Sequence, residues 1–157
     1  LISSNLLKDV SVKEENGFDD AQCIPQIYSK CLYAIITNKV SYFYRQRNNS
    51  ILHSNNFPLL QAYRTYTFYL AFADKFCTNA VKQIQLMIIY QELKLCCVNY
   101  SEKYTYKNAI TISKELKTFA KENKNSVKIN DNKMKLAIKF PRIFRLLFIL
   151  KRKNIIR

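Results

Sequence analysis

The chain has 157 residues, enough for one domain, and 48% of them are hydrophobic, which argues against intrinsic disorder. One glycine and three prolines argue against a turn-rich β-sandwich or barrel and favour long helices. The formal net charge of +15 predicts attraction to a polyanion, such as nucleic acid, an anionic lipid surface or a phosphorylated substrate.

Residues 1–16 begin with an apolar, helix-compatible run and then become polar. Because the chain begins at Leu1 and not at a methionine, we expect a truncated or partial product. Gly17 is the only glycine, so we expect it where the backbone needs a positive φ or a close approach.

An acidic pair, Asp19-Asp20, opens a short predicted helix. Either carboxylate is a natural N-cap, because it can accept hydrogen bonds from the free N–H groups of the first turn. Pro25 fits that first turn, where its missing N–H costs nothing. Helical spacing predicts that four side chains face a core: Ile24, Ile27, Tyr28 and Cys31.

Two short strands are predicted next. Residues 33–37 (YAIIT) and 40–45 (VSYFYR) are rich in β-branched and aromatic side chains, and Asn38-Lys39 separates them. Residues 48–50 then have the composition of a turn.

The remaining chain is predicted to be helical. Apolar residues recur at helical spacing over residues 57–75, 79–100, 106–122 and 133–152, and Pro141 is expected to bend the last helix. The helix over 79–100 carries a broad apolar stripe, so it should be buried on more than one side.

Two segments in the first third of the chain resemble family 2 glycosyltransferases, the bacterial enzymes that build surface polysaccharides. Members often carry an acidic pair ahead of an apolar helix, then a strand, and then a segment of the form YYYRQRxxSI. The counterparts here are FDDA (residues 18–21) and YFYRQRNNSI (residues 42–51). The second motif is fairly specific, and the order and spacing of the two support the resemblance.

The resemblance implies an α/β fragment followed by a mostly α region. Residues 1–55 would be the C-terminal, acceptor-side end of a GT-A nucleotide-sugar transferase domain, with a short helix and two short strands. Residues 56–130 would form a helical extension, and residues 131–157 a basic amphipathic tail.

The resemblance also implies roles for individual residues. In inverting enzymes of this type, a carboxylate at the position of Asp20 removes a proton from the acceptor hydroxyl, and Asp19 is the neighbouring candidate. Arg45 and Arg47 alternate on the predicted strand, so both can face one anion, and guanidinium groups match the oxygens of a departing diphosphate. Substrate-binding candidates that follow in the same segment are Ser50 and His53.

The chain contains no Asp-x-Asp motif, which in this family reaches the divalent metal and the donor diphosphate. We therefore expect Mg²⁺ or Mn²⁺ in a complete parent enzyme, no metal bound by this chain alone, and no activity of the isolated chain. Neither the donor sugar nor the acceptor, saccharide or lipid-linked, is specified by these residues.

Residues 133–157 contain no acidic residue and interleave large apolar residues with nine lysines and arginines. The uncharged run 146–150 is much too short to span a bilayer. Two interpretations remain open for this tail: an amphipathic helix in the interface of an anionic membrane, or a helix that packs on the preceding ones.

The cysteines and the aromatic residues are more simply explained as structural residues than as functional ones. Five cysteines without C-x-x-C spacing and a single histidine do not form a usual zinc pattern, and they predict reduced, buried thiols in a cytoplasmic protein. The aromatic run over residues 63–72 resembles a base-stacking platform, but its helical spacing favours a core over nucleic-acid binding. The competing function is a non-catalytic basic helical protein that binds a membrane surface or a polyanion.

Overall fold

The computed structural model describes residues 2–13, 15, 18–33, 35, 38–39 and 57–152. The helices in these residues are α1 (Ser4–Leu7), α2 (Asp19–Tyr28), α3 (Phe57–Phe76), α4 (Val81–Cys97), α5 (Tyr106–Glu122), α6 (Asn132–Lys139) and α7 (Pro141–Arg152). A short 3-10 helix, η3 (Thr78–Ala80), joins α3 to α4.

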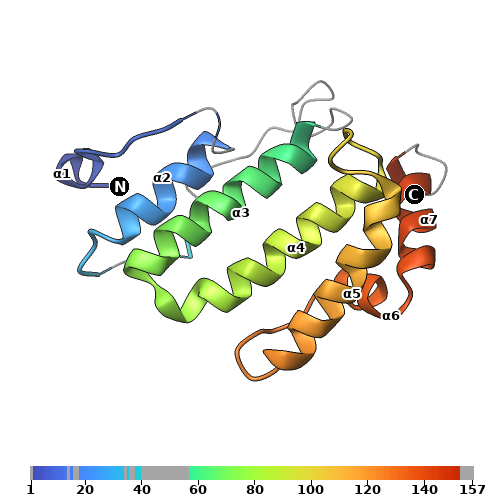
Figure 1. The fold of residues 1–157 in the computed structure, drawn as a ribbon. Helices are drawn as coiled ribbons and strands as arrows, with labels where there is room; N and C mark the ends of the chain where they lie inside the picture. Colours follow the sequence, from blue (N-terminus) through green and yellow to red (C-terminus); the bar gives the residue numbers. More distant parts are fainter. Residues whose placement is uncertain are drawn as a thin grey trace.

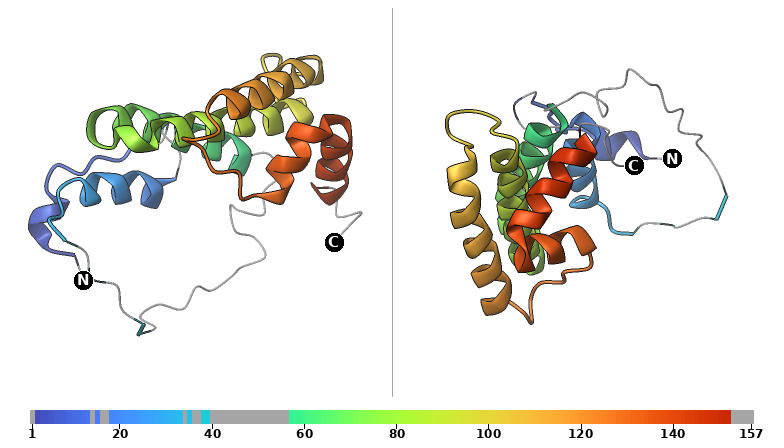
Figure 2. Two further views of the ribbon diagram at one scale, coloured as in Figure 1. Left: turned by 90° about the horizontal axis from the view of Figure 1, so that it is seen from below. Right: turned by 90° about the vertical axis from the view of Figure 1, so that its right-hand side faces the viewer.

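Helix α4 lies between α3 and α5, and the three run back and forth along one another (Figure 1). Helix α2 packs along the outer side of α3, whereas α6 and α7 pack together at the other end of the molecule, against α5 and α4 (Figures 1 and 2). Asp19 and Asp20 in α2 are therefore on the opposite side of the central helices from α6 and α7.

Helix α4 carries the centre of the hydrophobic core. Leu86, Leu95 and Cys96 are fully buried, and Leu93 and Tyr90 are nearly so. Because α4 has neighbours on several sides, its apolar residues are buried around much of the helix, as its broad stripe predicted.

The helix ends are fixed by local hydrogen bonds. Asn99 follows α4 with φ 49°, a left-handed conformation that asparagine tolerates, and its Oδ1 accepts a hydrogen bond from the Tyr106 backbone N–H at 2.6 Å. Asp131 caps α6, because its Oδ1 accepts a hydrogen bond from the Lys133 backbone N–H at 2.8 Å. The Ser113 hydroxyl donates to the Ala137 carbonyl at 3.1 Å and joins α5 to α6.

The single bent helix predicted over 133–152 is instead two helices. Helix α6 ends at Lys139, Phe140 leaves the helical region at φ −136° and ψ 69°, and Pro141 begins α7. Proline is favoured at the first position of a helix and unfavourable in its interior, which accounts for the start of a new helix at Pro141.

The predicted α/β fold class is wrong: the described residues form helices and no strand. In the first predicted strand, residues 33 and 35 are described, and neither belongs to a strand. Tyr33 and Ile35 are 79% and 84% exposed, and β-branched or aromatic residues form a strand only where another strand pairs with them. The second predicted strand, residues 40–45, lies outside the described residues, as does Gly17.

The start of α2 also differs from the prediction. Its N-cap is Phe18, and Asp19 and Asp20 occupy the first turn instead of capping it. Pro25 consequently lies inside the helix, beyond its first turn. The prediction that Pro25 fits the first turn was wrong, because Pro25 would be the fifth helical residue even with Asp20 as the N-cap.

Candidate functional site

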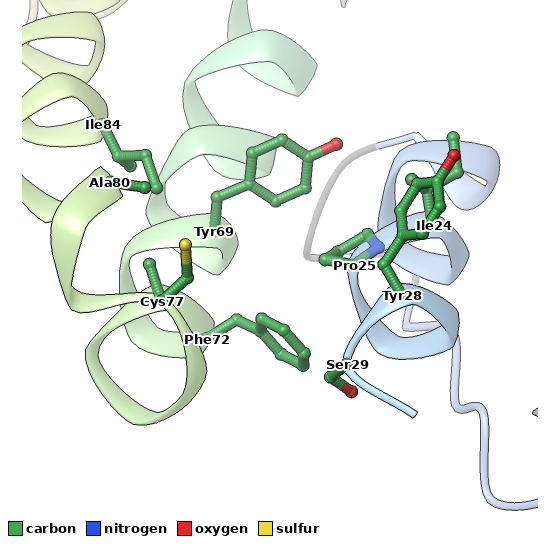
Figure 3. Close-up of a pocket in the computed structure, with 10 residues that line it drawn as sticks. Ile24, Pro25, Tyr28, Ser29, Tyr69, Phe72, Cys77, Ala80 and Ile84 are labelled. Carbon is green, nitrogen blue, oxygen red and sulfur yellow. The ribbon is translucent and has the colours of Figure 1, made fainter. Parts of the chain in front are cut away.

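A pocket of about 420 Å³ lies between α2, the end of α3 and the beginning of α4 (Figure 3). Helix α2 contributes Ile24 and Tyr28, and α3 contributes Tyr69 and Phe72. Cys77 lines the same pocket from the connection between α3 and α4. The lining is mostly apolar and aromatic, which is typical of a site for a small apolar ligand.

The pocket follows from side-chain spacing on two adjacent helices. Ile24 and Tyr28 are four residues apart on α2, so they lie on one face, and Tyr69 and Phe72 are three apart on α3. Small residues at Ala73 and Ala80 leave the space between these larger side chains open.

The sequence predicted that this face of α2 would be covered by a core, but Ile24 is 50% exposed and Tyr28 is 62% exposed. Ile27 and Cys31 are half-buried. The prediction was wrong for Ile24 and Tyr28, because periodicity identifies an apolar face and does not show whether another element fills the space opposite.

The acidic pair lies in the first turn of α2, before the residues that line the pocket. Asp19 and Asp20 are both exposed, and the Asp20 Oδ1 accepts a hydrogen bond from the Ala21 backbone N–H at 2.8 Å. Asp20 is four residues before the pocket-lining Ile24, so the two side chains share one face of α2. Burial raises the pKa of the Tyr69 phenol, and the charges of Tyr66 and Asp20 raise it further.

Two glutamines hold α2 in position. The buried Gln22 side chain accepts a hydrogen bond from the Lys13 backbone N–H at 2.9 Å and donates one to the Lys13 carbonyl at 3.0 Å. Gln26, one turn later, makes the same pair of bonds with Ser11, at 3.1 and 2.8 Å. The side-chain amides thus act like peptide groups that bind the extended segment before α2.

A further hydrogen bond joins this unit to α3. The Phe18 backbone N–H donates to the buried Thr65 hydroxyl at 3.3 Å. The N-terminus of α2, with Asp19 and Asp20, is thereby fixed relative to the helix that carries Tyr69.

The structure places only part of the predicted site. Asp19 and Asp20 are exposed in the first turn of α2 and do not line the pocket, whereas Arg45, Arg47, Ser50 and His53 lie outside the described residues. Sequence analysis missed the pocket residues Tyr69, Phe72 and Cys77. The available signal was the aromatic run over 63–72, which was interpreted as core.

The described part of the chain contains no group of three or more His, Cys, Asp or Glu residues that could hold a metal ion. The divalent metal expected in a complete parent enzyme remains a prediction. The candidate site therefore consists of an apolar pocket and, one helical turn before Ile24, the exposed carboxylate of Asp20.

No protein-family model, curated protein or solved structure matches this chain. The resemblance to family 2 glycosyltransferases is thus carried by the FDDA and YFYRQRNNSI segments alone.

None of the helices in the described ranges combines the length and the hydrophobicity that a membrane-spanning helix requires.

Proposed function

We propose that this chain is the C-terminal, acceptor-binding part of a glycosyltransferase that moves a sugar from a nucleotide-sugar donor to a lipid-linked or saccharide acceptor in surface polysaccharide synthesis. The observation that carries the proposal is the position of Asp20. Its exposed carboxylate lies one helical turn before Ile24, which lines the pocket, and on the same face of α2. The two sequence segments that resemble family 2 enzymes support the reaction class.

The proposed role of Asp20 is that of general base. Its carboxylate accepts the proton of the acceptor hydroxyl as that oxygen attacks the anomeric carbon of the donor. A new carbon–oxygen bond forms while the bond from the anomeric carbon to the diphosphate breaks, and the diphosphate leaves with the electron pair. Arg45 and Arg47 remain the predicted groups that would balance the growing negative charge.

The pocket favours a lipid-linked acceptor over a free saccharide. A sugar in this space would lose hydrogen bonds from its hydroxyls to water and find few polar partners among Ile24, Tyr28 and Phe72. An alkyl or prenyl chain would instead cover apolar side chains that are otherwise exposed. The volume of about 420 Å³ is within the range of small-molecule pockets.

The decisive experiment replaces Asp20 with asparagine in the longer coding sequence to which the proposal assigns this chain. We expect kcat/KM for sugar transfer to fall by about 100-fold or more, because the base is lost while its shape is kept. Asp19→Asn is the matched control and should cost less than about tenfold. Transfer that is unchanged in a folded Asp20→Asn variant would contradict the proposal and favour the non-catalytic basic binding protein.

The class of acceptor can be tested by ligand binding to the isolated chain, for which we expect no transferase activity. Cys77 is exposed and lines the pocket, so its alkylation rate reports occupancy. Farnesyl phosphate should slow alkylation of Cys77, a free disaccharide should not, and the half-buried Cys31 serves as the internal control. Equal protection of both cysteines, or none, would argue against a lipid-binding pocket.

A further inference from the structure

Helix α7 has two apolar faces, and only one of them is packed. On the inner face, Phe144 is 3% exposed and its ring lies 5.9 Å from the ring of Tyr90 in α4. Phe148 stacks on Phe144 at 5.6 Å and continues this inner face. Phe144 and Phe148 thus attach α7 to the core.

The second face points away from the core. Its residues are exposed: Ile143 by 49%, Leu146 by 59% and Leu147 by 41%. We call these three residues the outer α7 face. Spacings of three and four residues place them along one stripe, on a helix at the outer surface of the molecule (Figure 2).

Cations border this stripe on both sides. Arg142 is one turn before Leu146, and Lys151 is one turn after Leu147, and both are exposed. Arg145 is placed differently, because its guanidinium carbon lies 3.5 Å from the centre of the Tyr106 ring on α5. The free cations thus belong to the outer side of α7.

The basic residues around the outer α7 face indicate the charge of the partner that this face would bind. Helices α6 and α7 together contain seven lysines and arginines and no aspartate or glutamate, so the outer α7 face is an apolar stripe in a strongly basic part of the chain. A second copy of this chain would bring another +15 against it. An anionic surface that also accepts apolar side chains satisfies both features.

We propose that the outer α7 face binds the surface of an anionic phospholipid bilayer. Helix α7 has 12 residues and would lie in the plane of the interface, since about 20 are needed to span a bilayer. The outer α7 face would enter the acyl boundary, while Arg142 and Lys151 extend along it to headgroup phosphates.

This inference does not depend on glycosyl transfer. The outer α7 face lies at the end of the molecule away from α2 and its pocket (Figures 1 and 2). Asp20→Asn should therefore leave bilayer binding unchanged, which keeps the two proposals experimentally separate.

The test measures sedimentation of the full 157-residue chain with vesicles of phosphatidylcholine, with and without phosphatidylglycerol. We expect binding only to the anionic vesicles, and the Leu146→Ser/Leu147→Ser variant should bind about tenfold more weakly. Ile110→Ser is the matched control, because Ile110 is a 42% exposed apolar residue on α5, outside this face.

A second pair of variants tests the electrostatic contribution to vesicle binding. Arg142→Gln/Lys151→Gln should weaken binding about fivefold for each cation removed, and added salt should weaken wild-type binding further. Lys114→Gln/Lys117→Gln removes two exposed cations from α5 and should have a smaller effect.

Three outcomes would overturn the proposal, provided that circular dichroism shows folded variants. The first is equal binding to neutral vesicles. The second is unchanged vesicle binding by Leu146→Ser/Leu147→Ser, including the case in which that variant only loses binding to heparin or RNA. The third is a Leu146→Ser/Leu147→Ser variant that differs from wild type only in self-association, measured by sedimentation velocity, and not in vesicle binding.

Discussion

The two sides of α3 use similar side chains in different ways. On the α4 side, Leu86, Leu93 and Leu95 are at most 1% exposed and form the centre of a closed core. On the α2 side, the only buried residue of α2 is Gln22, while Ile24 and Tyr28 remain exposed around a pocket. Apolar burial thus holds the core, whereas directional hydrogen bonds hold the candidate site.

This contrast has a functional consequence. A helix that buries little apolar surface contributes little to global stability and can open locally at low cost. An apolar pocket bordered by such a helix can admit a ligand without disturbing the core.

Truncation of the core should be the most damaging change. Leu86 is fully buried in α4, so Leu86→Ala removes buried methyl groups and leaves a cavity, which should lower the free energy of unfolding by about 3 kcal/mol. Ile24→Ala, at a 50% exposed position in the pocket wall, should cost less than about 1 kcal/mol. Urea unfolding measures both, and equal losses would contradict the contrast between the two sides.

Loss of a glutamine should free α2 without unfolding the core. Gln22→Ala removes the two hydrogen bonds to Lys13 and should destabilise the α2 segment locally by about 1–2 kcal/mol. Amide hydrogen exchange should become about tenfold faster in α2 and stay unchanged in α4. Gln26→Ala removes more exposed bonds to Ser11 and should have a smaller effect, so a reversed order would contradict this account.

Alkaline pH should weaken the core through a buried thiol. Burial raises the pKa of Cys97 from 9.0 to about 12, so above pH 9 the thiol ionises in the unfolded chain but stays protonated in the native one. The stabilisation is complete below pH 9 and is lost as the pH rises towards 12, by about 1 kcal/mol at pH 10. Cys97→Ala should remove this part of the pH dependence.

The stability of Cys97→Ala must be compared with that of wild type at each pH, because Lys94 changes the stability in the opposite direction as the pH rises. Burial lowers the pKa of Lys94 from 10.5 to about 8, so its contribution to stability increases between pH 8 and 10.5. Denaturant unfolding at pH 7 and pH 10, under reducing conditions, gives the difference between Cys97→Ala and wild type. A difference that does not change between the two pH values would show that Cys97 is not the group responsible.

Much of the helical framework could be predicted from sequence. The predicted helix over 106–122 coincides with α5, and the prediction over 57–75 differs from α3 by one residue. Long stretches with helical periodicity contain enough repeats for the pattern to be unambiguous. The strand prediction had no such support, because residues 33–37 carry only local propensity and a strand depends on a neighbour elsewhere in the chain.

The candidate site could be predicted only in part. The acidic pair was evident in the sequence. The pocket was not predicted, because Ile24 and Tyr28, which line it, were expected to be core residues. Gln22 bonds to Lys13, nine positions away, and Gln26 bonds to Ser11, fifteen positions away. No local sequence pattern predicts hydrogen bonds over such separations. Only the packing of α2 on α3 brings Ile24 and Tyr28 into one pocket with Tyr69.

The sequence by itself determined the positions of the long helices and the strongly basic character of residues 133–157, because helical periodicity and charge are properties of neighbouring residues. Tertiary structure alone decided which apolar faces are covered. The inner face of α7 meets Tyr90, whereas its outer face and the pocket side of α2 remain open. An apolar stripe specifies that burial is favourable, and only the three-dimensional arrangement specifies what is available to bury it.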